Sequence, residues 1–121
     1  MKAHEEHRYF VKNANQFSVV KCENILYCIA DKGYTILYTT EDEKYMISKS
    51  LTKFLSEVQY PYLIRISQSV LVNIQYVKHV HNKEKCVVLK NGEKLYYTLS
   101  YGELQAQIVN LHNNRKLSQD G

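Results

Sequence analysis

The sequence has no tryptophan, only one proline and four scattered glycines, and it has no long apolar run. So few glycines and prolines leave little room for long flexible linkers, and they do not form a glycine-rich phosphate-binding loop. No segment approaches the roughly 20 apolar residues of a transmembrane helix. The first ten residues, MKAHEEHRYF, lack the hydrophobic region of a secretory signal peptide. We therefore expect a cytoplasmic protein without a membrane partner, and 121 residues are enough for one domain.

Residues that could carry metal or catalytic chemistry are also few. The three cysteines, Cys22, Cys28 and Cys86, lack Cys-x-x-Cys spacing, which predicts buried thiols in a reducing compartment without a disulfide framework or a zinc site. His79 and His81 would share one face of a strand, a spacing that can bind metal but is more often an exposed or half-buried pair. No histidine is grouped with serine or cysteine as in nucleophilic catalysis. We expect no enzyme activity, no catalytic residues, no metal and no cofactor.

Short β-type runs separated by turn residues predict most of the secondary structure. Eleven tyrosines fit a β-rich chain with amphipathic faces. The pair Asn91-Gly92 predicts a hairpin whose two turn positions both have positive φ. Residues 1–16 are polar without a clear period and predict a lead-in that is partly disordered. The predicted strands are residues 17–21, 25–30, 34–40, 44–48, 76–81, 86–90 and 93–97, with two more inside 62–73.

Two helices are predicted. In the first, apolar residues recur at i, i+3, i+4 and i+7, with Ser50 as N-cap and Pro61 beyond its end: Leu51, Phe54, Leu55 and Val58. This stripe packs in a core or, less often, binds a partner. The second helix is expected over about 101–112, where Ser100 and Glu103 match a capping box. The polar tail 113–121 is expected to fray. The fold class is therefore mainly β.

The stretch from Tyr62 to Asn73, YLIRISQSVLVN, interrupts an apolar strand pattern with a polar insert. An arginine followed by small hydroxyl and amide side chains suits hydrogen bonds to phosphates and base edges better than proton transfer. The net charge of +4 is compatible with a nucleic-acid partner, although many unrelated proteins share it. On composition alone, the lysines near the predicted turns form an ordinary solvated surface.

Four stretches taken together resemble the LytTR (LytR/AlgR-type) DNA-binding domain of bacterial response regulators. The most specific element is R-x-x-x-S-x-L-V-N, which starts at Arg65 and ends at Asn73. The resemblance spans about residues 17–112, between the lead-in 1–16 and the tail 113–121. The four stretches are ENILYCIADKGYTILY at 23–38, SKSLTKFLSEV at 48–58, YLIRISQSVLVNIQYVKHV at 62–80 and VVLKNGEKLYYTLSYGEL at 87–104.

The resemblance implies an elongated antiparallel β-sheet or sandwich domain with one or two short helices. Such domains put loops into successive major grooves of double-stranded DNA, bind promoter direct repeats and regulate transcription in two-component systems. The implied partners also include a homodimer on DNA and an upstream receiver domain or sensor kinase. The implied contact loops are residues 31–35, 65–69 and 98–101. Within them Tyr34, Gln68 and Ser100 match base-reading positions. Backbone contacts are expected from Arg65, Lys32, Lys49, Lys53, Ser67 and Ser69.

Two departures from the family pattern change what is expected. The histidine of the central motif is Ser67 and is followed by Gln68, which can bond bidentately to adenine. The segment Thr98–Tyr101 lacks two arginines of the family pattern, and a bidentate arginine–guanine contact discriminates by about 1–3 kcal/mol. Affinity should then depend more on phosphate contacts, and therefore on salt. The alternative function is a protein-interaction module that has weak or no DNA affinity and uses an exposed strand edge.

Overall fold

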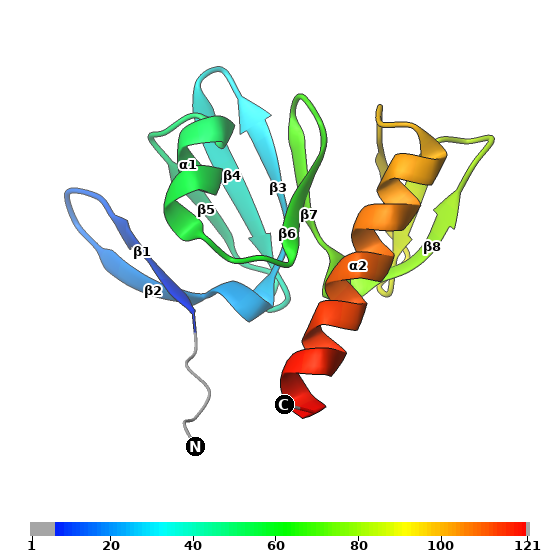
Figure 1. Ribbon diagram of the computed structural model, residues 1–121. Coiled ribbons are helices and arrows are strands. Elements are labelled where there is room, and N and C mark those ends of the chain that lie inside the picture. The colour runs from blue at the N-terminus through cyan, green and yellow to red at the C-terminus, as the bar shows by residue number, and fades with distance from the viewer. Residues whose placement is uncertain (1–6, 121) are drawn as a thin grey trace.

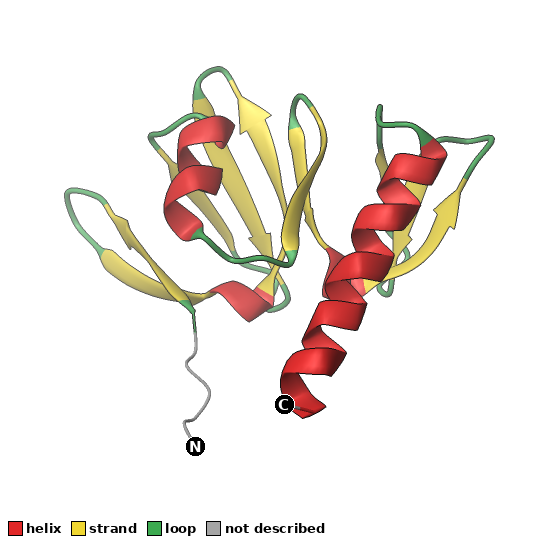
Figure 2. Cartoon of the chain, in the orientation of Figure 1, coloured by secondary structure: helices red, strands yellow, loops and turns green. Residues whose placement is uncertain are grey.

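The computed structural model describes the backbone of residues 7–120 and the side chains of residues 7–114. Its strands and helices confirm a mainly β fold with two α-helices (Figures 1 and 2). Short 3-10 helices at Cys22–Asn24 (η1) and Ile74–Tyr76 (η2) precede two of the strands. In chain order the other elements are β1 (Arg8–Lys12), β2 (Phe17–Lys21), β3 (Ile25–Asp31), β4 (Tyr34–Thr39), β5 (Lys44–Ile47), α1 (Leu51–Val58), β6 (Leu63–Ser67), β7 (Val70–Asn73), β8 (Val77–His81), β9 (Cys86–Leu89), β10 (Lys94–Tyr96) and α2 (Tyr101–Asp120).

The strands form three antiparallel sheets that lie side by side (Figure 1). A central five-stranded sheet has the order β5-β4-β3-β7-β6. The hairpin β1–β2 flanks it on one side, and a three-stranded sheet of order β10-β9-β8 flanks it on the other. Most neighbouring strands within a sheet are also consecutive in sequence and are joined by short connections. The three sheets therefore follow one another along the chain, which gives an elongated arrangement.

The central sheet separates two hydrophobic cores, and the alternation of side chains along its strands supplies both. Cys28 and Leu71 face the first core, which α1 and the β1–β2 hairpin cover. Tyr27 and Val72 are their neighbours in sequence and face the second core, between the central sheet, the three-stranded sheet and α2. Successive strand residues point to opposite faces, so a sheet buried on both faces needs apolar residues at nearly every position.

The helical stripe and the cysteines occupy the predicted environments. Leu51 and Phe54 of α1 are buried in the first core, so the stripe is core packing rather than a partner-binding face. Ser50 caps α1, since its side chain accepts a hydrogen bond from the Lys53 backbone N–H at 3.1 Å. The three cysteines are buried free thiols, as expected. Within the described residues, no helix combines the length and the apolar character needed to span a membrane.

Two predicted boundaries differ from the structure. Residues 8–12 form β1 rather than a disordered lead-in, because Val11 is buried once β1 pairs with β2; residues 1–6 lie outside the described residues. Helix α2 continues to Asp120 instead of ending near 112. Its apolar stripe ends at Leu111, but no glycine or proline follows until Gly121, which also lies outside the described residues. The stripe therefore does not mark the end of the helix.

The turns differ in detail from the prediction. The hairpin at Asn91-Gly92 is present between β9 and β10, but only Gly92 of the pair has positive φ (95°). In the turn between β3 and β4, by contrast, both central residues are left-handed: Lys32 (φ 52°) and Gly33 (φ 88°). Two such residues suit the twist of a tight hairpin. Lys32 is thereby held at the apex of the first candidate loop.

Candidate nucleic-acid interface

Strand register places the first two candidate loops at the same end of the molecule. Strand β3 is antiparallel to β7, with Ile29 opposite Val70. The β3–β4 turn and the β6–β7 turn therefore leave the central sheet on the same side, at the top of Figure 1. A hydrogen bond from the Ala30 N–H to the Ser69 carbonyl (2.9 Å) joins the bases of these two turns.

Hydrogen bonds also join the other connections at this end of the molecule to one another and to the first two loops. The N–H of Thr98, in the third candidate loop, donates to the Ile66 carbonyl of β6 at 2.9 Å. Lys85, in the β8–β9 turn, donates through Nζ to the Leu99 carbonyl at 2.6 Å. The Thr35 hydroxyl donates to the Lys49 carbonyl just before α1, at 2.9 Å. We call this region the loop end: residues 31–35, 48–53, 65–70, 82–85 and 98–101.

The guanidinium of Arg65 forms hydrogen bonds to other residues of the protein. Its Nε donates to the Ser67 carbonyl (3.2 Å), its Nη1 donates to the Thr52 hydroxyl (2.8 Å), and its Nη2 donates to the Gln68 carbonyl. An arginine has five N–H groups, so three bonds leave two N–H groups for other acceptors. A register irregularity between Arg65 and Ser67 lets the turn bend where the guanidinium reaches it.

The three residues expected to read bases are all exposed at the loop end, but they differ in what else they do. Gln68 stands in the β6–β7 turn, and Arg65 uses its carbonyl rather than its side-chain amide. Tyr34 begins β4 and is 44% exposed. Ser100 caps α2, since its hydroxyl accepts a hydrogen bond from the Glu103 N–H at 3.1 Å. The structural role that the sequence favoured for Ser100 is therefore confirmed.

The lysines expected to contact the DNA backbone fall into two groups. Lys32 is exposed in the β3–β4 turn. Lys49 and Lys53 share the carboxylate of Glu57, at 2.7 Å and 3.9 Å, and a hydrogen bond from Lys49 is the main cause that lowers the pKa of Glu57. One carboxylate offsets only one of two ammonium charges, so this pair keeps a net positive charge beside the start of α1.

The opposite end of the molecule has the opposite charge. There the connections η1, β4–β5 and β9–β10 carry five carboxylates: Glu23, Glu41, Asp42, Glu43 and Glu93. We call this region the acidic end: residues 22–24, 40–43 and 90–93. A hydrogen bond from the Thr40 N–H to the Asn24 carbonyl (2.8 Å) joins two of its connections. The loop end also contains Asp31 and Glu84, and the acidic end contains Lys90, but cations outnumber carboxylates at the loop end and carboxylates outnumber cations at the acidic end. A polyanion is therefore attracted to the loop end and repelled by the acidic end.

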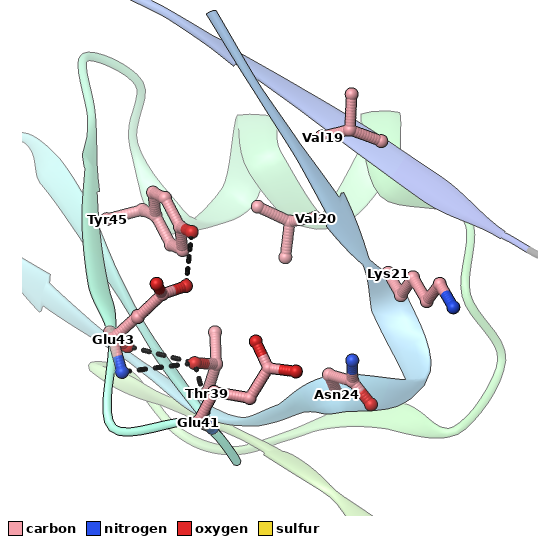
Figure 3. Close-up of a pocket in the computed structure, with 8 residues that line it drawn as sticks. All are labelled: Val19, Val20, Lys21, Asn24, Thr39, Glu41, Glu43 and Tyr45. Carbon is pink, nitrogen blue, oxygen red and sulfur yellow. Dashed lines mark hydrogen bonds between the residues drawn. The ribbon is translucent and has the colours of Figure 1, made fainter.

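Hollows occur at both ends, and their linings differ. A hollow of about 480 Å³ at the loop end lies between the second and third loops and α1, and is lined by Thr52, Arg65, Ser67, Gln68, Thr98 and Leu99. At the acidic end a pocket of about 170 Å³ holds Glu41 and Glu43 (Figure 3). Its polar atoms bond to one another, as in the Tyr45 hydroxyl that donates to Glu43 at 2.6 Å. Only the first hollow contains candidate residues.

Three residues have roles that the sequence did not indicate. Asn73 matched a polar position of the family motif, but it is fully buried and its side-chain amide donates to the Ile25 carbonyl at 2.9 Å. Thr52 and Lys85 bind residues of the second and third loops, respectively. Their contacts cross between elements 13 and 14 residues apart, which no local pattern indicates.

The histidine pair lies outside the loop end. The rings of His79 and His81 are 5.9 Å apart on β8, and both side chains are exposed, as expected for the ordinary interpretation of this spacing. Within the described residues, no group of three or more histidine, cysteine, aspartate or glutamate side chains is placed to hold a metal ion.

Comparison with known proteins agrees with the resemblance seen in the sequence. The family model "LytTr DNA-binding domain" matches residues 15–108. The Staphylococcus aureus (strain N315) "Transcriptional regulatory protein LytR" is 27% identical over 104 residues, which cover 84% of this chain and 42% of that protein. The Streptococcus agalactiae "Sensory transduction protein LytR" is 27% identical over 86 residues, or 69% of this chain and 35% of that protein.

A solved structure has the same fold. The "LytTr DNA-binding domain of putative methyl-accepting/DNA response regulator from Bacillus cereus" superposes with a TM-score of 0.70 at 18% identity, over 87% of this chain and 98% of that one. The chain thus spans less than half the length of the curated relatives and nearly all of the solved domain. The family model covers most of the chain, and the chain belongs to the LytTr DNA-binding domain family.

Proposed function

We propose that this chain binds double-stranded DNA through the loop end and is the DNA-binding module of a transcription regulator. The observation that carries the proposal is the gathering of all three candidate loops at the positively charged end of the molecule, with carboxylates gathered at the other. Membership of a family of DNA-binding domains supports the same function. The unit that binds DNA is proposed to be residues 17–112.

Gln68 is the main base-reading residue of the proposal. Its side chain is exposed on a turn held from behind by Arg65, and a glutamine can bond bidentately to the N6 and N7 atoms of adenine. Tyr34 and Ser100 are proposed to make the base contacts of the other two loops. Ser100 would do so with a hydroxyl that already caps α2, and it can still donate its own hydrogen.

Backbone contacts are proposed to come from exposed or half-buried cations and hydroxyls around the same loops. Arg65 would use the two N–H groups that its three internal bonds leave. Each phosphate contact releases counterions, so binding should weaken steeply as salt rises. The proposed contacts are Lys32, Lys49, Lys53, Arg65, Ser67 and Ser69.

The proposal about a longer regulator and its partners rests on the relatives rather than on this chain. The matching relatives are named as transcriptional regulatory and sensory transduction proteins, and each is more than twice as long as its matched region. We propose a cytoplasmic response regulator in which a receiver domain or sensor kinase acts on this module. Promoter direct repeats, with a homodimer on the DNA, are the proposed target.

Titration against promoter fragments from the source genome, with random duplexes of equal length as control, tests the proposal. At least one fragment should bind more tightly than random duplex at the same salt concentration. If every fragment binds like random duplex, sequence-specific binding is ruled out.

A second candidate function has an observation of its own. Strand β5 is one of the two edge strands of the central sheet and pairs only with β4 among the described strands, and Met46 on it is 59% exposed. A partner strand could add to this edge. Negligible DNA binding even at low salt would favour this protein-interaction module, whereas steep loss of binding with rising salt favours DNA binding.

A further inference from the structure

We propose that Arg65 is a positioning residue, which fixes the direction in which Gln68 leaves the protein by joining the β6–β7 turn to α1. This inference rests on the proposed DNA-binding function and assigns the guanidinium a role different from a phosphate contact. It is carried by three hydrogen bonds from one side chain to three separate residues.

The two carbonyls that Arg65 binds belong to the peptide groups on either side of Gln68. The Ser67 carbonyl lies in the peptide group before Gln68, and the Gln68 carbonyl lies in the one after it. Holding both peptide planes fixes φ and ψ of the residue between them. The Cα–Cβ direction of Gln68 is therefore set by the guanidinium, although Arg65 does not touch the Gln68 side-chain amide.

The third bond connects this turn to the hydrophobic core. Thr52, which accepts from Nη1 at 2.8 Å, lies in the first turn of α1 next to Leu51. Leu51 and Phe54 are 2% and 0% exposed, so the helix start cannot move without disturbing the first core. The turn is thus fixed relative to packed side chains rather than only to its own edge strand, β6.

Fixing the turn before DNA arrives favours specific binding. A loop that is ordered in advance loses less conformational entropy on binding, and a bidentate contact to a base edge tolerates little error in direction. A lysine could replace the charge of Arg65 but not its function, because one ammonium cannot bind three acceptors in the plane of a guanidinium fork.

Arg65→Lys and Thr52→Val test the inference, with Ser56→Ala as matched control. Ser56 lies on the same helix, is exposed, and donates only to the Lys53 carbonyl of its own turn (2.8 Å) among its described contacts. For each variant, affinity for the best duplex and for random duplex is measured over a range of salt concentrations. The order parameter of the Gln68 amide is measured by NMR in the free protein.

Positioning predicts that Arg65→Lys lowers the ratio of specific to random affinity by about tenfold, the size of one lost base contact, while the salt dependence stays unchanged. Thr52→Val should change the ratio in the same direction but less, because two of the three bonds remain. Both variants should lower the Gln68 order parameter, and Ser56→Ala should change none of these quantities.

Two results would overturn the inference. One is an Arg65→Lys protein that keeps wild-type specificity and an ordered Gln68 amide, since lysine would then suffice as a phosphate contact. The other is an unchanged Gln68 amide in both variants. If the wild-type protein shows no sequence preference, the proposed function fails instead, and the order parameter still decides whether Arg65 holds the turn.

Discussion

The loop end and the acidic end are built from the turns of the same strands, but they differ in how their charged side chains are bound. At the loop end, side chains bind backbone carbonyls: Thr35 binds Lys49, Arg65 binds Ser67 and Gln68, and Lys85 binds Leu99. This arrangement fixes the loop backbones and leaves Tyr34 and Gln68 exposed. Turn backbones that are bound from behind can present their own side chains outward.

At the acidic end two of the carboxylates, those of Glu43 and Glu93, accept hydrogen bonds from other side chains. The Tyr27 hydroxyl donates to Glu93 at 2.8 Å, and the side-chain amide of Asn91 donates to the same carboxylate at 3.0 Å. The first of these bonds joins the central sheet to the β9–β10 turn. The charged groups of the acidic end thus join neighbouring elements, whereas those of the loop end hold loop backbones whose own side chains stay exposed.

Reversing charge at the two ends should give the largest difference between them. Lys32→Glu with Lys53→Glu should lower DNA affinity by about a hundredfold at moderate salt and reduce the salt slope by about two, because two phosphate contacts become repulsive. The control, Glu23→Lys with Glu41→Lys at the acidic end, should leave affinity equal or slightly higher. Fluorescence anisotropy titrations measure both. Equal losses at the two ends would contradict the assignment of the loop end.

Gln68→Ala tests which residue of the loop end reads sequence. Discrimination at one base pair should fall by about 1–3 kcal/mol, while random duplex binds as before. Binding to a panel of duplexes with single substitutions measures this, with Gln16→Ala in the β1–β2 hairpin as the amide control. A uniform loss on every duplex would contradict base reading by Gln68.

Two threonines of β4 allow the ends to be compared within one strand. Thr35 and Thr39 are both buried, and their hydroxyls donate to the Lys49 carbonyl (2.9 Å) and the Glu43 carbonyl (3.1 Å). Valine at 35 removes the side-chain donor of the Lys49 carbonyl, and valine at 39 removes the acceptor of the Glu41 and Glu43 N–H groups. Either change should lower the free energy of unfolding by about 1–2 kcal/mol. Urea denaturation measures that loss. Only Thr35→Val should also weaken specific DNA binding; a matching loss in Thr39→Val would show that stability alone is responsible.

A pH dependence should come from two groups, Cys22 in the acidic end and Tyr60, which interacts with it. Burial raises the pKa of Cys22 to about 11 and, as its main cause, raises the pKa of Tyr60 to about 12. Both groups hold their protons more tightly in the folded state, so their contribution is complete below the unfolded pKa values of about 8.5 and 10 and is lost as pH rises through the folded values. Urea midpoints should fall modestly between pH 8 and 10.5, and less in Cys22→Ala. A midpoint that rises over this range would contradict the sign.

Much of the fold could be predicted because its signals are local. The stripe from Leu51 to Val58, the cap Ser50 and the strand runs all depend on residues within a few positions of each other. Strand β1 could not be predicted, since RYFVK has no turn signal or long alternation and becomes a strand only by pairing with β2. The end of α2 was missed because the apolar spacing stops at Leu111 while the helix continues to Asp120.

Some features of the candidate site could be predicted from the sequence, and others could not. The exposed loop positions of Tyr34, Gln68 and Ser100 agree with the loops expected from the family motif. The internal bonds of Arg65 could not be read from the motif, because the partner Thr52 is brought to it by the packing of α1. Charge patterning placed the lysines near turns, but only the topology gathers those turns at one end.

The second core also sets the distance between the loops that are proposed to contact DNA. The turns at 31–34 and 67–70 leave the central sheet, whereas the loop at 98–101 leads from β10 into α2, on the other side of that core. Ile66, Val87 and Leu104 fill the space between them and are all 0% exposed. In the proposed complex, the volume of these side chains sets how many base pairs separate the contacts of neighbouring loops. A core substitution far from any phosphate could change the spacing of the preferred site.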